Sequence, residues 1–85
     1  MYNDTTLDAT LGHQLLDTQG LQCPLPLLKA KRALSHLKVG EKLKVLATDA
    51  GSQRDFVAWT RLTGHHLHQN ECIDNVYHYL IEKRI

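Results

Sequence analysis

Apolar residues recur along the chain at two spacings, one typical of helices and one typical of strands. Four of them lie three or four residues apart, as on one face of a helix: Leu27, Ala30, Leu34 and Leu37. This spacing predicts a first helix from Pro24 to about Leu37, with Gly40 as its stop signal. The basic residues Lys29, Lys31 and Arg32 then fall largely on the other faces of this helix.

A second helix is predicted from about Gln53 to Thr63, and Gly64 would end it. Ser52 and Asp55 have the spacing of a capping box at its start, with Asp in place of the usual Glu. Helical periodicity predicts a buried stripe of Phe56, Val57 and Thr60, with Trp59 or Leu62 on its edge.

Four segments are predicted as strands from their short apolar or alternating runs: His13–Asp17, Lys42–Thr48, Leu67–Ile73 and Val76–Lys83. Leu43, Val45 and Ala47 alternate along the second strand and should face the core. Asp74-Asn75 suits a tight hairpin turn between the last two strands. Residues 1–12 are polar and have no clear period, so we expect a flexible lead-in there.

The predicted order of elements is βαβαββ within a single domain, residues 13–85. The first strand, helix and next strand form a unit that prefers a right-handed parallel crossover, and the last two strands form an antiparallel hairpin. Two helices on one face of a mixed four-stranded sheet would bury both apolar stripes and leave the other face to water. The expected fold is therefore a two-layer α/β sandwich.

Composition narrows the classes of function. The 85 residues suffice for one small domain, and 42% hydrophobic with 22% charged residues is typical of a soluble globular protein. The net charge of +1 predicts no overall attraction to nucleic acid or to anionic membranes, so we expect neither as a direct partner. Because no long apolar run or signal-peptide pattern occurs, the cytoplasm is the expected location.

Cys23 is the candidate reactive residue, because it directly precedes Pro24 where the first helix should start. Proline is favoured in the first turn, so Pro24 is predicted as the first helical residue and Cys23 as the N-cap. Its sulfur would face the helix dipole and the N–H of Leu25 or Leu27, which can lower a cysteine pKa from ~8.5 to roughly 3.5–7.5. Pro26 would stiffen this turn. The alternative interpretation of Cys23 is a small buried apolar side chain.

The other metal-binding or thiol side chains are predicted to be structural. Cys72 lies in a predicted strand, where core packing is the expected role, and a disulfide with Cys23 is the alternative. His65, His66 and His68 invite a metal hypothesis, but no C-x-x-C or acidic cluster completes a site. We therefore predict no metal centre.

The segment Cys23-Pro24-Leu25-Pro26, followed by a Lys-rich helix, resembles the C-P-x-P signature of the TusA/SirA-like family of small sulfur carriers. The similarity covers roughly residues 15–83 and continues through Gly40-Glu41-Lys42-Leu43, Thr48-Asp49, Arg54-Asp55 and Tyr79-Leu80-Ile81. The resemblance implies the same two-layer sandwich. It also implies a sulfur relay without a cofactor, in which a Cys23 thiolate accepts the terminal sulfur of a donor persulfide and passes it on.

The same resemblance implies protein partners. The donor would be a cysteine desulfurase or another sulfurtransferase such as a rhodanese-like protein, and the acceptor a downstream sulfur-relay protein. Lys29, Lys31 and Arg32 would dock the partner and Asp49 matches a further family position, although a solvated helix face also explains these basic residues. The family serves tRNA 2-thiouridine formation among other pathways, but that branch commonly has an acidic residue where this chain has Leu25.

Two other classes of function stay open. A thiol redox regulator would form a disulfide or a sulfenic acid at Cys23 under oxidant, although no second cysteine is close in sequence to resolve it. A binding module for tRNA or for a protein would use Cys23 only incidentally, and the low net charge counts against tRNA.

Overall fold

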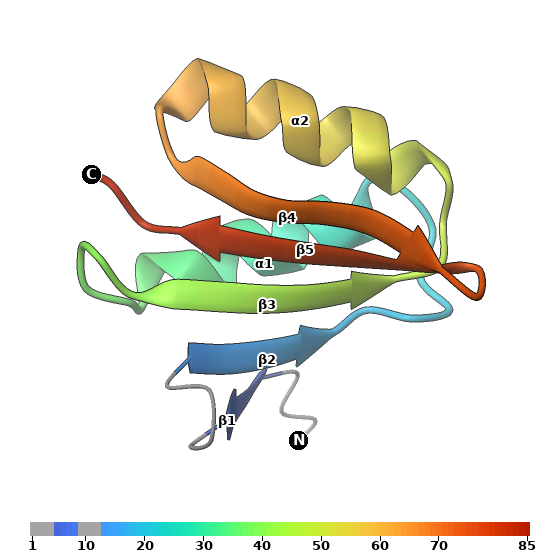
Figure 1. Ribbon diagram of the computed structural model, residues 1–85, viewed down its shortest axis with the longest axis horizontal. Coiled ribbons are helices and arrows are strands. Elements are labelled where there is room, and N and C mark those ends of the chain that lie inside the picture. The colour runs from blue at the N-terminus through green and yellow to red at the C-terminus, as the bar shows by residue number, and fades with distance from the viewer. Residues whose placement is uncertain (1–4, 9–12) are drawn as a thin grey trace.

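A computed structural model describes residues 5–8 and 13–85 of the chain. They form a two-layer α/β sandwich in which two helices cover one face of a sheet (Figure 1). In chain order the elements are β1 (Thr5–Asp8), β2 (His13–Asp17), α1 (Leu25–Ser35), β3 (Lys42–Ala47), α2 (Gly51–Thr63), β4 (His66–Ile73) and β5 (Val76–Glu82). Neither helix of these described ranges is long and apolar enough to cross a membrane.

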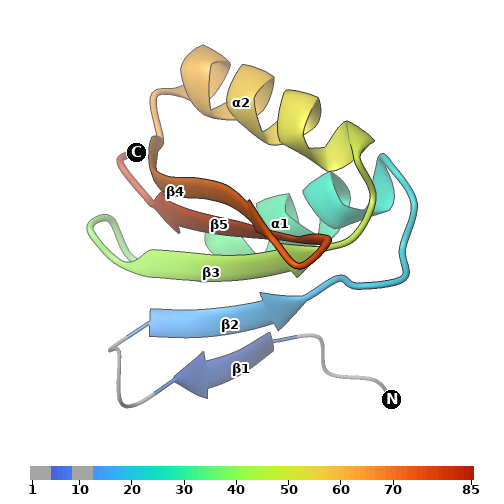
Figure 2. The same ribbon diagram turned by 45° about the vertical axis from the view of Figure 1, so that its right-hand side comes forward.

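The strands lie in the order β1-β2-β3-β5-β4 (Figure 2). β2 and β3 are parallel and joined through α1, while the other neighbouring pairs are antiparallel. The predicted βαβαββ order and the mixed sheet are confirmed. Leu16 lies opposite Val45, which in turn lies opposite Tyr79, so these three side chains form one row on the helix-covered face.

β1 adds a fifth strand beside the four that were predicted. Thr5–Asp8 pairs antiparallel with β2, and Thr6 lies opposite Leu15. The rest of the expected flexible lead-in, residues 1–4 and 9–12, lies outside the described residues. The run Thr5-Thr6-Leu7-Asp8 has no clear apolar alternation, so its pairing depends on the free edge of β2 rather than on a local signal.

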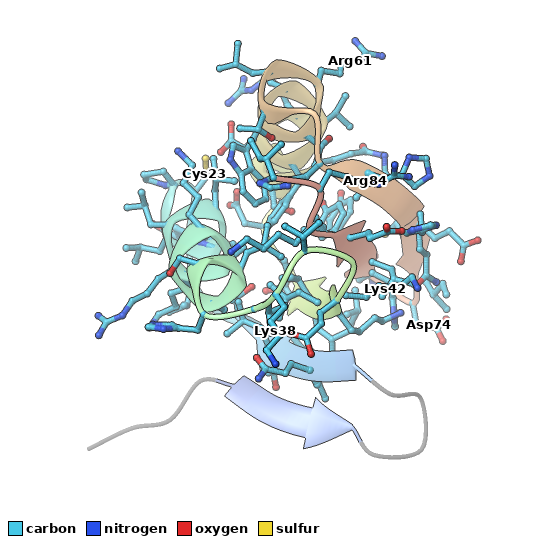
Figure 3. The ribbon with its side chains drawn as sticks, turned by 90° about the vertical axis from the view of Figure 1, so that its left-hand side faces the viewer. Cys23, Lys38, Lys42, Arg61, Asp74 and Arg84 are labelled. Atoms are coloured by element: carbon cyan, nitrogen blue, oxygen red, sulfur yellow. The ribbon has the colours of Figure 1, made fainter. Side chains whose placement is uncertain are left out.

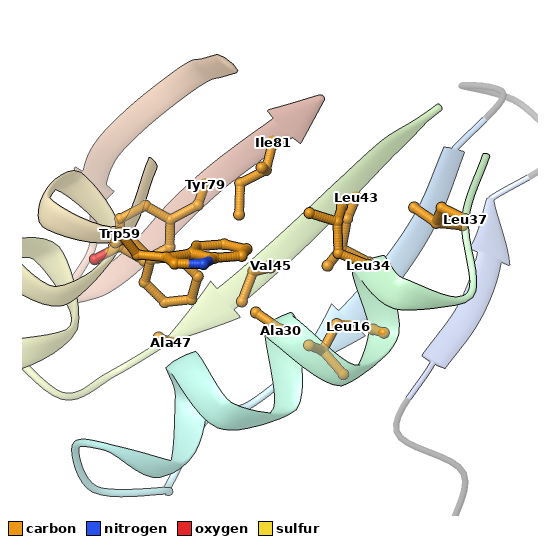
Figure 4. Packing of buried hydrophobic residues seen from close by; sticks show 12 residues of the cluster. Leu16, Ala30, Leu34, Leu37, Leu43, Val45, Ala47, Trp59, Tyr79 and Ile81 are labelled. Atoms are coloured by element: carbon orange, nitrogen blue, oxygen red, sulfur yellow. The ribbon is translucent and has the colours of Figure 1, made fainter. Parts of the chain in front are cut away.

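Both helices pack their apolar sides against the same face of the sheet (Figure 4). The buried core consists of Leu16, Ala30, Ala33, Leu34, Leu37, Leu43, Val45, Ala47, Phe56, Trp59, Tyr79 and Ile81. The predicted burial of Leu43, Val45 and Ala47 on β3 is confirmed. Phe56 of α2 stacks on Tyr79 of β5 with ring centroids 4.4 Å apart, which joins the second helix to the centre of the sheet.

α1 begins one residue later than predicted, and this changes the position of Cys23. Pro24, with φ −97° and ψ 14°, is the N-cap, and Leu25 is the first helical residue. Cys23, joined to Pro24 by a cis peptide bond, therefore precedes the N-cap instead of forming it. The Leu25 N–H donates to the carbonyl of Gln22 at 2.9 Å, so this donor is not available to the thiol. Pro26 is buried in the first turn.

α2 begins two residues earlier than predicted and lacks the predicted capping box. Its N-cap is Ala50, and the Asp49 carboxylate accepts a hydrogen bond from the Gly51 N–H at 3.0 Å. Ser52 and Asp55 lie inside the helix, and their side chains bond to other elements. Tertiary contacts, rather than capping, therefore explain both residues.

The buried side of α2 is rotated slightly from the prediction. Its buried apolar and polar side chains include Phe56, Trp59 and Thr60. Val57 is only half-buried and Leu62 is exposed, because the helix turns its Trp59 side toward the sheet. Gly64, with φ 88°, ends the helix as predicted in the left-handed conformation that glycine adopts without strain.

Candidate functional site

The loop between β2 and α1, which carries Cys23, is anchored to the end of β3. Thr18 is fully buried and donates both its N–H and its hydroxyl to the Leu46 carbonyl, at 2.8 Å and 2.6 Å. The Gly20 N–H donates to the Thr48 hydroxyl at 2.9 Å. These bonds fix the path of the chain on its way to Cys23.

The Cys23 thiol lies against α2 rather than against its own helix. In the end view of Figure 3, Cys23 lies between α1 and α2. Its Sγ donates a hydrogen bond to Oδ2 of Asp55. Gly51, the first residue of α2, lies so close that an added Cβ would be 3.6 Å from Sγ and 2.9 Å from the Asp49 carboxylate. The thiol is half-buried and therefore remains reachable.

The electrostatic surroundings of Cys23 differ from the prediction. The hydrogen bond to Asp55, together with burial and the negative charges of Asp55 and Asp49, raises the thiol pKa above its ordinary value. The positive charge of Arg54 acts in the opposite direction. The expected lowering of the pKa is therefore wrong for the free protein. The prediction placed an anion at a helix dipole, whereas the fold places two carboxylates beside the sulfur.

The remaining motif residues line the start of α1. Leu25 is exposed between the two prolines, and Leu28 is exposed one turn further along the helix. Two of the three predicted docking residues, Lys31 and Arg32, are exposed, and Lys29 is half-buried. The surface that follows Cys23 along α1 therefore combines apolar and basic side chains.

Two residues of this site were not identified as such from the sequence. Asp55 is predicted as part of a helix cap, and Gly51 has no predicted role. The signal for Asp55 was its match to the family pattern at Arg54-Asp55. Its contact with Cys23 spans 32 residues of sequence and depends on how α2 packs, which local spacing does not reveal.

Cys72 is exposed, so its predicted core packing is wrong. It lies opposite Tyr77 near the hairpin end of β4, which is the outermost strand of the sheet. An edge strand has a sheet neighbour on one side only, and the end of β4 that carries Cys72 is exposed throughout. Both cysteines are free thiols, so the alternative of a structural disulfide is also excluded.

The histidines at the start of β4 have other partners. The His68 ring lies 2.7 Å from a Glu82 carboxylate oxygen, and Nδ1 of His65 accepts a hydrogen bond from the Arg84 N–H at 3.1 Å. His66 and His68 contact each other edge to face. Within residues 5–8 and 13–85 no group of three or more potential metal ligands comes together.

Comparison with known proteins identifies the family. The family described as sulfurtransferase TusA matches residues 14–83, from the second residue of β2 to just past the end of β5. The sulfur carrier protein TusA of Allochromatium vinosum is 44% identical over 70 residues, which cover 82% of this chain and 92% of that protein.

A solved structure agrees with the fold. The SirA-like protein of Desulfitobacterium hafniense is 25% identical and superposes with a TM-score of 0.73, over 84% of this chain and 97% of that one. The family match over residues 14–83 includes Cys23, Gly51 and Asp55. The chain belongs to the TusA family.

Proposed function

We propose that this protein is a sulfur carrier in which Cys23 holds the transferred sulfur as a persulfide. The position of Cys23 is the observation that supports this role most directly. It is a half-buried, free thiol between the two helices, inside the family-matched segment, and its sulfur bonds to a charged side chain. Exposed Cys72, on an edge strand, has no comparable surroundings.

Loading is an exchange at sulfur that needs no oxidant. The Cys23 thiol loses its proton, and the resulting thiolate attacks the outer sulfur of a donor persulfide. A new S–S bond forms at Cys23 while the S–S bond of the donor breaks, and the departing donor thiolate takes up one proton. Cys23 then carries an –S–SH group, and an acceptor thiol removes the outer sulfur by the same exchange.

The surface beside Cys23 suits a protein partner rather than a small substrate. Leu25 and Leu28 offer exposed apolar area, and Lys31 and Arg32 add positive charge to the same helix. Interfaces commonly combine an apolar centre with a charged rim, and charge complementarity raises the rate of encounter. We assign this α1 surface, with Lys29 included and Asp49 at the neighbouring loop, to docking of an acidic rim around a partner's reactive cysteine.

A cysteine desulfurase or another sulfurtransferase is the proposed donor, and a sulfur-relay protein the proposed acceptor. The A. vinosum relative carries the name of a sulfur carrier protein, which supports this class of partner. tRNA thiolation is one destination of such sulfur. Leu25, in place of an acidic residue, makes the docking surface more apolar and favours a partner with a matching apolar contact. We expect the exchange in the cytoplasm, where thiols stay reduced.

Mass spectrometry tests the proposal. The purified protein is incubated with a cysteine desulfurase and cysteine, and the wild type should gain about 32 Da for each added sulfur, at Cys23. Cys23→Ser should gain nothing. Cys72→Ser is the matched control, since it removes a free thiol outside the helix layer and should load like the wild type. Loading of Cys23→Ser, or loss of loading in Cys72→Ser, would show that Cys23 is not the residue that carries the sulfur and would refute the proposal.

A further inference from the structure

The contact between Cys23 and Asp55 has a consequence for the resting state of the site. Sγ is the donor and Oδ2 of Asp55 the acceptor, so the contact exists only while the thiol keeps its proton. Gly51 packs directly beside the thiol, since an added Cβ there would lie in ordinary van der Waals contact, 3.4 Å from Cys23 Cβ and 3.6 Å from Sγ.

We propose that Asp55 is a positioning residue that holds Cys23 as a protonated thiol directed at α2 in the unloaded carrier, and that Arg54 opposes this hold. The inference rests on the proposed function of Cys23 and specifies its regulation. The protonated Cys23 thiol is poorly reactive as long as Asp55 accepts its hydrogen bond. A docked partner with a cationic side chain can neutralise Asp55 or move its carboxylate away from the sulfur. The carrier thereby reacts with its donor in preference to adventitious electrophiles.

The arrangement of Arg54 and Asp55 supports an adjustable hold rather than a fixed structural bond. Arg54 Nε lies 3.7 Å from the second carboxylate oxygen of Asp55, and its side chain is 81% exposed while that of Asp55 is 20% exposed. Arg54 therefore competes for the same carboxylate from the solvent side. A cation closer to Asp55 would reduce the negative potential at the sulfur.

Three charged side chains that act on the thiol come from α2 and the loop before it. Asp55 contributes the hydrogen bond and a negative charge, Asp49 a further negative charge, and Arg54 an opposing positive charge. The Asp49 carboxylate accepts a hydrogen bond from the Gly51 N–H at 3.0 Å, whereas Asp55 accepts one from the thiol itself. Asp55 is thus the side chain through which the protonation of Cys23 is controlled.

Deprotonation of Cys23 and transfer of sulfur from the donor balance in protons and electrons. When Asp55 is neutralised by a cation, the thiol proton leaves to solvent or to the partner, and the Cys23 thiolate attacks the donor persulfide. The donor leaves as a thiolate that takes up a proton, so one proton is lost and one is consumed. The S–S bond is transferred without net oxidation or reduction.

The pH dependence of alkylation tests this inference with opposite shifts. In a Cys72→Ser background, which leaves one thiol, the rate of reaction with iodoacetamide is measured against pH because the thiolate is the reacting form. Asp55→Asn should move the midpoint to lower pH and accelerate the reaction at pH 7. Arg54→Gln should move the midpoint to higher pH and slow it. Arg61→Gln changes another exposed arginine of α2 and should leave the profile unchanged.

The outcomes separate this inference from the proposed function. An unchanged or upward midpoint in Asp55→Asn refutes the proposed role of Asp55, and an unchanged or downward midpoint in Arg54→Gln refutes the proposed role of Arg54. Circular dichroism establishes that each variant is folded. If Asp55→Asn does not fold, the Arg54→Gln variant still tests the inference, because Arg54 is exposed. Persulfide loading that depends on Cys23 supports the carrier whichever way the midpoints move, whereas loading of Cys23→Ser overturns the carrier alone.

Discussion

A buried hydrogen bond between Ser52 of α2 and Tyr79 of β5 fixes the start of α2 beside the candidate site. The two hydroxyl oxygens are 2.7 Å apart, and the residues are 1% and 0% exposed. Burial, partly offset by this hydrogen bond, raises the pKa of Tyr79 to about 12, so the phenol is neutral at physiological pH. We predict that either single variant, Ser52→Ala or Tyr79→Phe, destabilises the protein while the double variant costs little more than one of them.

The magnitude follows from what each change leaves behind. Tyr79→Phe keeps the ring that stacks on Phe56 but leaves the Ser52 hydroxyl without its partner, and Ser52→Ala leaves the phenol without its partner. An unsatisfied buried polar group costs about 1–3 kcal/mol, whereas the double variant leaves neither hydroxyl unsatisfied, so the second change adds little to the cost of the first. For a domain of this size, ~1 kcal/mol corresponds to a change in melting temperature of about 4–8 °C.

Urea unfolding of the wild type, both single variants and the double variant measures this coupling as a double-mutant cycle. The expected result is an interaction free energy of about 1–3 kcal/mol between the two hydroxyls, with unchanged m-values. Strictly additive effects would show that the two groups act independently, and the assigned role of the bond in placing α2 would then be wrong. A Leu62→Ala variant, on the exposed side of α2, is the control for nonspecific helix effects.

Two further predictions concern single positions. Gly51→Ala places a methyl group 2.9 Å from the Asp49 carboxylate and 3.6 Å from Cys23 Sγ. The variant should slow alkylation of Cys23 at fixed pH, and the free energy of unfolding should change by no more than about 1–3 kcal/mol. An unchanged alkylation rate would contradict the close packing of Gly51 on the thiol. The hydrogen bond with His68 lowers the pKa of Glu82, so its stabilisation is present above the ordinary carboxyl pKa and lost as pH falls through the lowered value. Glu82→Gln should therefore flatten the loss of stability in urea titrations below about pH 5, and a parallel pH profile would exclude this contribution.

Most of the fold could be predicted from the sequence because local periodicity and burial agree there. Leu43, Val45 and Ala47 alternate along β3 and all face the helices. Asp74 and Asn75 adopt φ of 50° and 65°, the left-handed conformations that a tight hairpin turn requires and that these residue types tolerate. Such features depend on neighbours within a few residues, and their patterns are visible without coordinates.

The failures occurred where a distant element decided the outcome. Cys72 lies in a predicted strand between Glu71 and Ile73, but β4 is an edge strand and its hairpin end remains exposed. The predicted cap residues Ser52 and Asp55 are instead used by β5 and by the loop before α1. Strand order and helix packing determine these contacts, and neither is encoded in the local spacing of residue types.

The ionisation of Cys23 is the most informative of these differences, because the motif and the fold act on the sulfur in opposite directions. A helix start favours a thiolate, but the Leu25 N–H is occupied by Gln22 and the sulfur is turned to Asp55. A carrier meets its donor only in a complex, so a thiol that is already ionised in the free protein would gain little and would be open to side reactions. A thiol held by a carboxylate that a partner can neutralise confines the reactive state to the complex, where the sulfur is transferred.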